Sequence, residues 1–195
     1  DGALYIADWS NPIIQHGEVD FRDPRRDHEH GRIWRVTAKG RPLAQKPKLT
    51  SASNSELFAH LLSPNAYNRR QARRVLTERA TNIVENLGPW TKSLSDEKQL
   101  LQALWMYQSI DEVEPDLLKR LLDAKDGRIR AAATRVLRYW QDRVGDPLDL
   151  LAKRVADEHP RVRVEALRAL AKSLDAEILR QIDAFDGVLV GHGGI

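Results

Sequence analysis

Two periods of hydrophobic residues divide the chain. Near its start, the segments "ALYIAD" and "RIWRV" alternate from one residue to the next, which places Leu4 and Ile6 on one face and Tyr5 on the other. From about Ser55 onward, apolar residues instead recur every three to four positions. The sequence therefore predicts two β-strands within residues 1–37, followed by a mainly helical region.

The segments around the strands are polar. A long stretch from Ser10 to Gly31, rich in Asp, Pro, His and Arg, joins the two strands. Two short strands are not stable alone in water, so they predict part of a larger sheet. Residues 38–55 combine Pro, Gly, Lys and Ser without a periodic apolar pattern, and this composition is typical of a linker.

The helical region contains an internal repeat. Four segments align by their residue types, namely "YNRRQARRVL" (67–76), "KQLLQALWMY" (98–107), "RIRAAATRVL" (128–137) and "RVRVEALRAL" (161–170). Each copy has an alanine at the same position, and these repeat alanines, which are 31, 30 and 33 residues apart, are Ala72, Ala103, Ala133 and Ala166. An apolar segment that can form a partner helix precedes each copy, at 55–62, about 81–88, 115–122 and 147–155.

Helix pairs at this period are typical of an α-solenoid of the HEAT type. We expect the solenoid over residues 56–185, and a frayed or truncated tail over residues 186–195. The predicted fold class is therefore mainly α, with a short β segment before the solenoid.

Composition removes several classes of function. The chain has no cysteine, which excludes disulfides, cysteine-ligated zinc, thiol catalysis and haem attachment through Cys-x-x-Cys-His. No apolar run approaches the length of a membrane span. The 31 basic and 28 acidic residues nearly balance, which disfavours nucleic acid as a partner.

The arginines of the repeat helices have two interpretations. They would bind phosphate groups if they formed one uninterrupted cationic stripe. Alternatively, they form an intramolecular ladder, in which Asp123, Asp126 and Asp157 in the turns pair with Arg130 and Arg163 across the stack. The near balance of charge favours the ladder.

The stretch "DHEHGRIWRV" (27–36) is the densest group of potential ligands. His28 and His30 are two residues apart, so on a strand both imidazoles would share a face, and with Asp27 or Glu29 they would suit a divalent metal ion. In the alternative, the acidic side chains pair with neighbouring arginines and the histidines hydrogen-bond within the loop. The residues alone leave both interpretations open.

The order of motifs resembles one protein family. "DGALYIADW", "NPIIQH" and "DHEHGRIWRV" resemble the last part of the β-propeller in the large membrane-bound dehydrogenases of planctomycetes and verrucomicrobia. "LLSPNAYNRRQARRVLTER" is similar to the start of the HEAT array that follows it there. The resemblance implies that residues 1–37 are the remnant of a propeller blade, and that the propeller is similar to that of quinoprotein sugar dehydrogenases.

The same resemblance implies a role and partners. The chain would be an inactive scaffold fragment that joins the missing propeller blades to a cytochrome c domain, with pyrroloquinoline quinone and haem c in the full-length protein and a periplasmic or cell-envelope location. His16, Asp27, His30 and Arg32 would then form the wall of a ligand or cofactor pocket, and no catalytic residue is expected in this chain. The alternative function is a stand-alone HEAT module that binds proteins through its solenoid surface.

Overall fold

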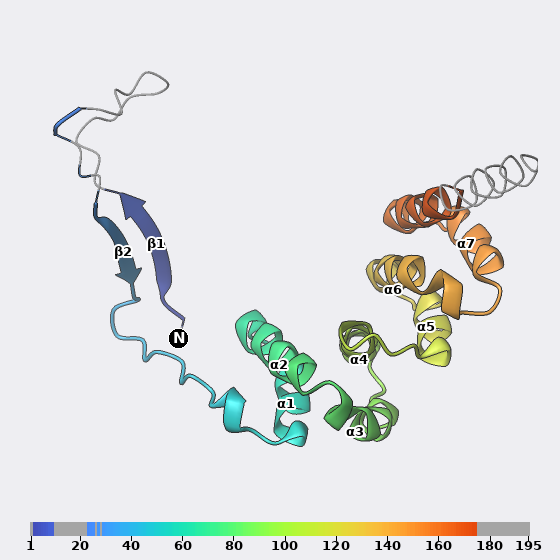
Figure 1. Cartoon of the computed structure of the whole chain (residues 1–195), viewed down its shortest axis with the longest axis horizontal. Coiled ribbons are helices and arrows are strands. Elements are labelled where there is room, and N and C mark those ends of the chain that lie inside the picture. Colours follow the sequence, from blue (N-terminus) through green and yellow to red (C-terminus); the bar gives the residue numbers. More distant parts are fainter. Residues whose placement is uncertain (1, 10–22, 26, 28, 175–195) are drawn as a thin grey trace, which may run out of the picture. The chain divides into compact units, whose positions relative to one another are not determined.

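The chain divides into two compact units, Asp1–Lys48 and Leu49–Ile195. Their structure was obtained as a computed structural model (Figure 1). It describes residues 2–9, 23–25, 27 and 29–174. Of the predicted segments, the tail at 186–195 lies outside these residues, as does the C-terminal limit of the solenoid.

The first unit contains a two-stranded antiparallel sheet. Strand β1 (Leu4–Trp9) pairs with β2 (Gly31–Val36), which confirms the two predicted strands. The indole Nε1 of Trp34 donates a hydrogen bond to Asp8 Oδ2 across the pair, at 2.9 Å. Gly31 is the first residue of β2, opposite Trp9.

The apolar side chains of this sheet are exposed on both of its faces. They are Leu4, Tyr5, Ile6, Ile33, Trp34 and Val36, each with 45% or more of its surface accessible. The described residues of the first unit therefore form a hairpin without a hydrophobic core and contain no third strand, so they give no evidence of a propeller.

The second unit consists of helical hairpins (Figure 1). Two short 3-10 turns, at Leu49–Ser51 and Gln141–Arg143, flank or join them. The hairpins pair α1 (Asn54–Leu61) with α2 (Ala66–Arg79), α3 (Thr81–Lys92) with α4 (Glu97–Ser109), α5 (Pro115–Leu122) with α6 (Gly127–Trp140), and α7 (Pro147–Val155) with a helix over residues 160–174. Each predicted helical segment is a helix, and the fold is mainly α.

Successive hairpins stack in two layers. Helix α2 contacts α4, and α4 contacts α6, so these helices form one layer, while α1 and α3 contact each other in the other layer (Figure 1). We call α2, α4, α6 and the helix at 160–174 the second helices, because each ends its hairpin. This stacking is consistent with the predicted α-solenoid.

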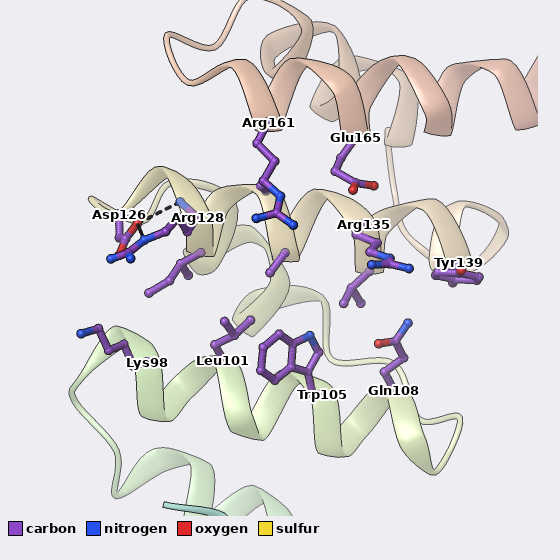
Figure 2. Close-up of a pocket in the computed structure, with 14 residues that line it drawn as sticks. Lys98, Leu101, Trp105, Gln108, Asp126, Arg128, Arg135, Tyr139, Arg161 and Glu165 are labelled. Carbon is purple, nitrogen blue, oxygen red and sulfur yellow. Dashed lines mark hydrogen bonds and ion pairs between the residues drawn. The ribbon is translucent and has the colours of Figure 1, made fainter. Parts of the chain in front are cut away.

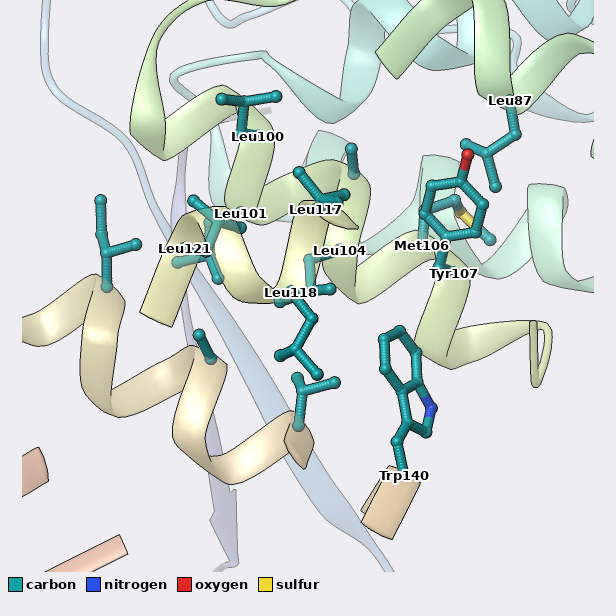
Figure 3. Close-up of a cluster of buried hydrophobic side chains, with 14 of the residues drawn as sticks. Leu87, Leu100, Leu101, Leu104, Met106, Tyr107, Leu117, Leu118, Leu121 and Trp140 are labelled. Carbon is teal, nitrogen blue, oxygen red and sulfur yellow. The ribbon is translucent and has the colours of Figure 1, made fainter. Parts of the chain in front are cut away.

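The repeat alanines explain how closely the helices approach. Ala72, Ala103, Ala133 and Ala166 are all completely buried. Larger apolar side chains from three helices fill the space around them, and Figure 3 shows Leu104 of α4, Leu118 of α5 and Trp140 of α6 pointing into a common interior. One core cluster runs without a break from Leu49 to Ala169.

The second helices begin in equivalent ways. Asn65, Asp96 and Asp126 are N-caps that each stand seven residues before a repeat alanine, and their side chains accept hydrogen bonds from backbone N–H groups of the first turn. His159 occupies the same position before the helix at 160–174. The caps therefore follow the repeat that the apolar residues define.

Helix α3 is longer than the sequence predicts. The expected helix covers about 81–88 and so ends before Pro89, a residue that removes a backbone hydrogen bond inside a helix. In the structure α3 continues to Lys92, and the Trp90 ring stacks on Phe58 of α1 with centroids 4.7 Å apart. This packing holds the last turn of α3 against the neighbouring hairpin.

Candidate binding groove on the second helices

The predicted loop site is described only in part. His16 and His28 lie outside the described residues, and Arg32 lies in β2. His30 directly precedes β2 and is not part of the strand, so the strand argument for paired imidazoles does not apply to it. Its Nδ1 is 3.1 Å from Asp27 Oδ1. The pocket wall and the metal pair therefore stay predictions.

Asp27 organises the segment before β2. Its Oδ1 accepts hydrogen bonds from the backbone N–H groups of Glu29 and His30, at 3.1 and 3.0 Å. These bonds, and the contact with the His30 ring, lower the pKa of Asp27. Among the described residues, no group of three or more His, Asp or Glu side chains is placed to hold a metal ion.

One pair of the predicted arginine ladder, Arg130 with Asp157, forms in the second unit, whereas Arg163 pairs with no predicted carboxylate. Arg130 of α6 donates through Nε and Nη2 to the two carboxylate oxygens of Asp157, both at 2.8 Å, and so links one hairpin to the next. Its Nη1 donates to the carbonyls of Ala124 and Lys125 in its own turn. The hydrogen bonds from Arg130 lower the pKa of Asp157.

Two other arginines hold turns in the same way. Arg69 donates to the carbonyls of Ser63 and Pro64, and Arg163 donates to those of Asp157 and Glu158. Like Arg130, each stands three residues before a repeat alanine. The guanidinium groups of these arginines therefore form hydrogen bonds within the fold.

Two predicted ladder partners are different in the structure. Asp126 pairs with Arg128, with Oδ2 2.7 Å from Nη2, rather than with Arg130 or Arg163, and the hydrogen bonds from Arg128 lower its pKa to about 2. Asp123 pairs with Arg154 of α7 at 3.0 Å. Asp126, the N-cap of α6, thus pairs within its own first turn, whereas Asp123 reaches the next hairpin but at a different arginine from the predicted ones.

A groove of about 720 Å³ crosses three consecutive second helices (Figure 2). Its apolar floor includes Leu101 and Trp105 from α4 and Ile129 and Val136 from α6. Its polar lining includes Lys98, Gln108, Asp126, Arg128, Arg135, Tyr139, Arg161 and Glu165. The groove combines an apolar base with a mostly cationic rim.

Two arginines of the rim have no side-chain partner among the described residues. Arg135 and Arg161 are exposed, and within the described part of the chain neither forms an ion pair or a hydrogen bond through its side chain. Figure 2 shows both guanidinium groups directed to the groove. Unlike the ladder arginines, they are available to an external anion.

A buried carboxylate lies between them. In Figure 2, Glu165 points from the helix at 160–174 toward α6, with Arg161 and Arg135 to either side. Glu165 is only 8% exposed, and its Oε2 has no hydrogen-bond partner among the described residues. Its other oxygen is 3.9 Å from Arg168 Nη1. A buried acceptor without a donor is costly, so a ligand N–H would stabilise it.

The indole of Trp105 forms the centre of the floor. The Arg73 guanidinium lies 5.5 Å from its ring centroid, and Arg73 Nη2 donates to Gln102 Oε1 at 2.7 Å. Burial lowers the pKa of Arg73. Arg73 thus supports the indole from α2, and the partly exposed remainder of the ring faces the groove.

The sequence contained a signal for this groove. Lys98, Arg128 and Arg161 each stand five residues before a repeat alanine, and Arg135 stands two residues after one. Equivalent positions on stacked helices lie side by side, so basic residues at one repeat position predict a row of cations. Grouping all the arginines together hides this row among the ladder residues.

Comparison with known families supports the repeat architecture. Residues 114–184 match the family model of HEAT repeats. Neither the curated proteins nor the solved structures gave a match to the chain. In the described part of the chain, no helix combines the length and apolar character needed to cross a membrane.

Proposed function

We propose that the chain is a HEAT-type scaffold that binds a protein partner in the groove of its second helices. HEAT repeats suggest a scaffold or protein-interaction module. The observation that supports this site is the pair of exposed arginines, Arg135 and Arg161, beside a partly exposed indole. Arginine, tryptophan and tyrosine are the side chains that contribute most to protein interfaces.

Site-specific photo-cross-linking tests this proposal. A photoreactive amino acid replaces Arg135 in the groove, and in a control chain it replaces Arg120, which is exposed on α5. We expect cross-links to a defined protein from position 135 in cells of the source organism, with the contact peptide identified by mass spectrometry. Equal cross-linking from both positions, or none from position 135, would contradict the proposal.

A second candidate function places this scaffold within a dehydrogenase. The resemblance of the N-terminal segment to a propeller blade, and the apolar side chains exposed on both faces of its sheet, favour a larger sheet around residues 4–36. In this proposal the solenoid joins a sugar-dehydrogenase-like propeller to a cytochrome c domain in the cell envelope. Pyrroloquinoline quinone and haem c would belong to those neighbouring domains.

The genomic neighbourhood tests this second candidate directly. Continuous reading of the coding sequence is expected to give further propeller blades before residue 1 and a Cys-x-x-Cys-His motif after residue 195. A stop codon and a start codon at these positions would exclude it. The pocket wall of His16, Asp27, His30 and Arg32 and the metal pair of His28 and His30 belong to the same proposal.

A further inference from the structure

We infer that the groove binds an acidic segment of a protein, extended over the second helices and anchored by one apolar or aromatic side chain. This inference rests on the proposed function, because it names the chemistry of the partner at the same groove.

The acidic character follows from the rim. Arg135 and Arg161 have no ion pair within the described residues, and Lys98 adds a third positive charge from α4. Arg128 is different, because Asp126 already neutralises it at 2.7 Å. Carboxylates of a bound segment would meet the unpaired cations on both sides of the floor.

The anchor follows from the floor. Trp105 is partly exposed between α4 and α6, and Ile129 and Val136 continue the apolar surface beside it. Tyr139, half exposed, closes one end. An apolar side chain that covers this surface would remove it from water, whereas an entirely polar ligand would leave it uncovered.

The buried acceptor favours a peptide over a nucleic acid. Glu165 presents an oxygen without a hydrogen-bond partner among the described residues, between Arg161 and Arg135 (Figure 2). A peptide backbone supplies N–H donors between its acidic side chains. A DNA backbone presents phosphate oxygens, which a buried carboxylate repels. The arginines of the site would thus meet the carboxylates of an acidic peptide, and the Glu165 oxygen would meet one of its backbone N–H groups.

Binding of a defined peptide to the full chain tests the inference. The probe is a fluorescein-labelled peptide with one tryptophan flanked on both sides by glutamates, and its matched control has glutamines in place of the glutamates. We expect saturable binding of the acidic probe by fluorescence anisotropy, weakening as salt is added. The double variant Arg135→Gln/Arg161→Gln should raise its Kd by about tenfold.

A control variant removes the same charge elsewhere. Lys119→Gln/Arg120→Gln changes two exposed cations of α5, outside the groove, and should alter the Kd by less than about twofold. Equal weakening by both double variants, equal binding of the glutamine probe, or tighter binding of a DNA duplex would each overturn the inference. Comparing the two probes on the unaltered chain keeps the test valid if a variant fails to fold.

The hydrogen bond to Glu165 has its own readout. N-methylation of the acidic probe, one backbone nitrogen at a time, should identify a position where binding to the unaltered chain weakens. That effect should disappear in Glu165→Met, because the acceptor is gone. A scan with no sensitive position would overturn the peptide-backbone assignment.

The two proposals fail in different ways. A cross-link from position 135 to a neutral or basic segment would keep the proposed function and overturn the acidic ligand. Absence of both the cross-link and the probe binding would overturn both.

Discussion

The Arg130 guanidinium joins two hairpins because its nitrogens have acceptors in both of them. Two nitrogens donate to Asp157 in the next hairpin, and the third donates to carbonyls of its own turn. The Arg130 side chain is 10% exposed and the Asp157 side chain 7% exposed, so the pair is held away from water. In this setting, loss of one partner leaves a buried charge without compensation.

Replacing Arg130 with methionine is therefore expected to destabilise the chain by about 3 kcal/mol. The double variant Arg130→Met/Asp157→Leu should be less destabilised than the single one, because it removes both charges. Urea unfolding of the double variant and of both single variants, Arg130→Met and Asp157→Leu, measures these losses. Additive losses would contradict the pairing as the main source of the effect.

Acid should weaken two ion pairs, Arg130 with Asp157 and Arg128 with Asp126. The folded-state pKa values of Asp126, about 2, and of Asp157 lie below their ordinary values, so the unfolded chain binds protons first as pH falls. Their contribution to stability is complete above about pH 5 and is lost progressively below about pH 4. Tm measured over this range should fall less steeply in Asp157→Asn than in the unaltered chain. Parallel slopes would contradict the assignment.

Gly127 is required by a contact with the following hairpin. A Cβ at this position would lie 2.5 Å from Cδ2 and 2.8 Å from Cβ of His159. Gly127→Ala should therefore destabilise the chain by about 1–3 kcal/mol, although alanine favours helices. Gly145→Ala, which meets no atom within 4 Å, is the matched control for thermal denaturation. Equal effects would contradict the role of His159.

At the scale of the helix, repetition is what the sequence predicts best. The helical segments, the buried repeat alanines and the strand pair all follow from apolar periodicity, which tertiary packing preserves. The end of α3 does not, because the Phe58–Trp90 stack, a contact between hairpins, carries the helix past Pro89.

The groove could not be predicted from the sequence as the helices were, and the reason differs from that for the end of α3. Its lining comes from three hairpins, and only the stacking brings Lys98, Arg128 and Arg161 to one face. Residue type alone does not distinguish these groove cations from Arg69, Arg130 and Arg163, whose guanidinium groups donate hydrogen bonds to carbonyls of the turns. The repeat position does separate them.

The helix caps allow a test of the repeat as a unit. Asp96 accepts hydrogen bonds from the N–H groups of Lys98 and Gln99, at 2.9 and 3.1 Å. Asp96→Ala should reduce the unfolding free energy by about 1 kcal/mol, and Asp96→Asn should retain most of it, because asparagine caps as well. Urea denaturation of the two variants decides. A similar loss in both would indicate that charge, rather than capping, is responsible.

At the scale of the whole molecule, stability resides in the second unit. The core cluster begins at Leu49, and none of the described residues of the first unit belongs to it. Stacked repeats gain their stability from their own cores and from the interfaces with their neighbours. The large apolar side chains described in the two strands of the first unit are exposed, so they do not contribute in that way.

Deleting residues 1–48 should therefore leave the Tm of the solenoid unchanged, because none of the described side chains in this segment belongs to the core cluster. Differential scanning calorimetry of the full and shortened chains measures this, and Leu57→Ala, which truncates a completely buried side chain, provides the positive control for a lowered Tm. A marked drop after the deletion would mean that the β segment packs on the helices as an arm. An unchanged Tm would mean that the solenoid does not need the β segment, whose apolar side chains could then pack against strands of another domain, as the second candidate function requires.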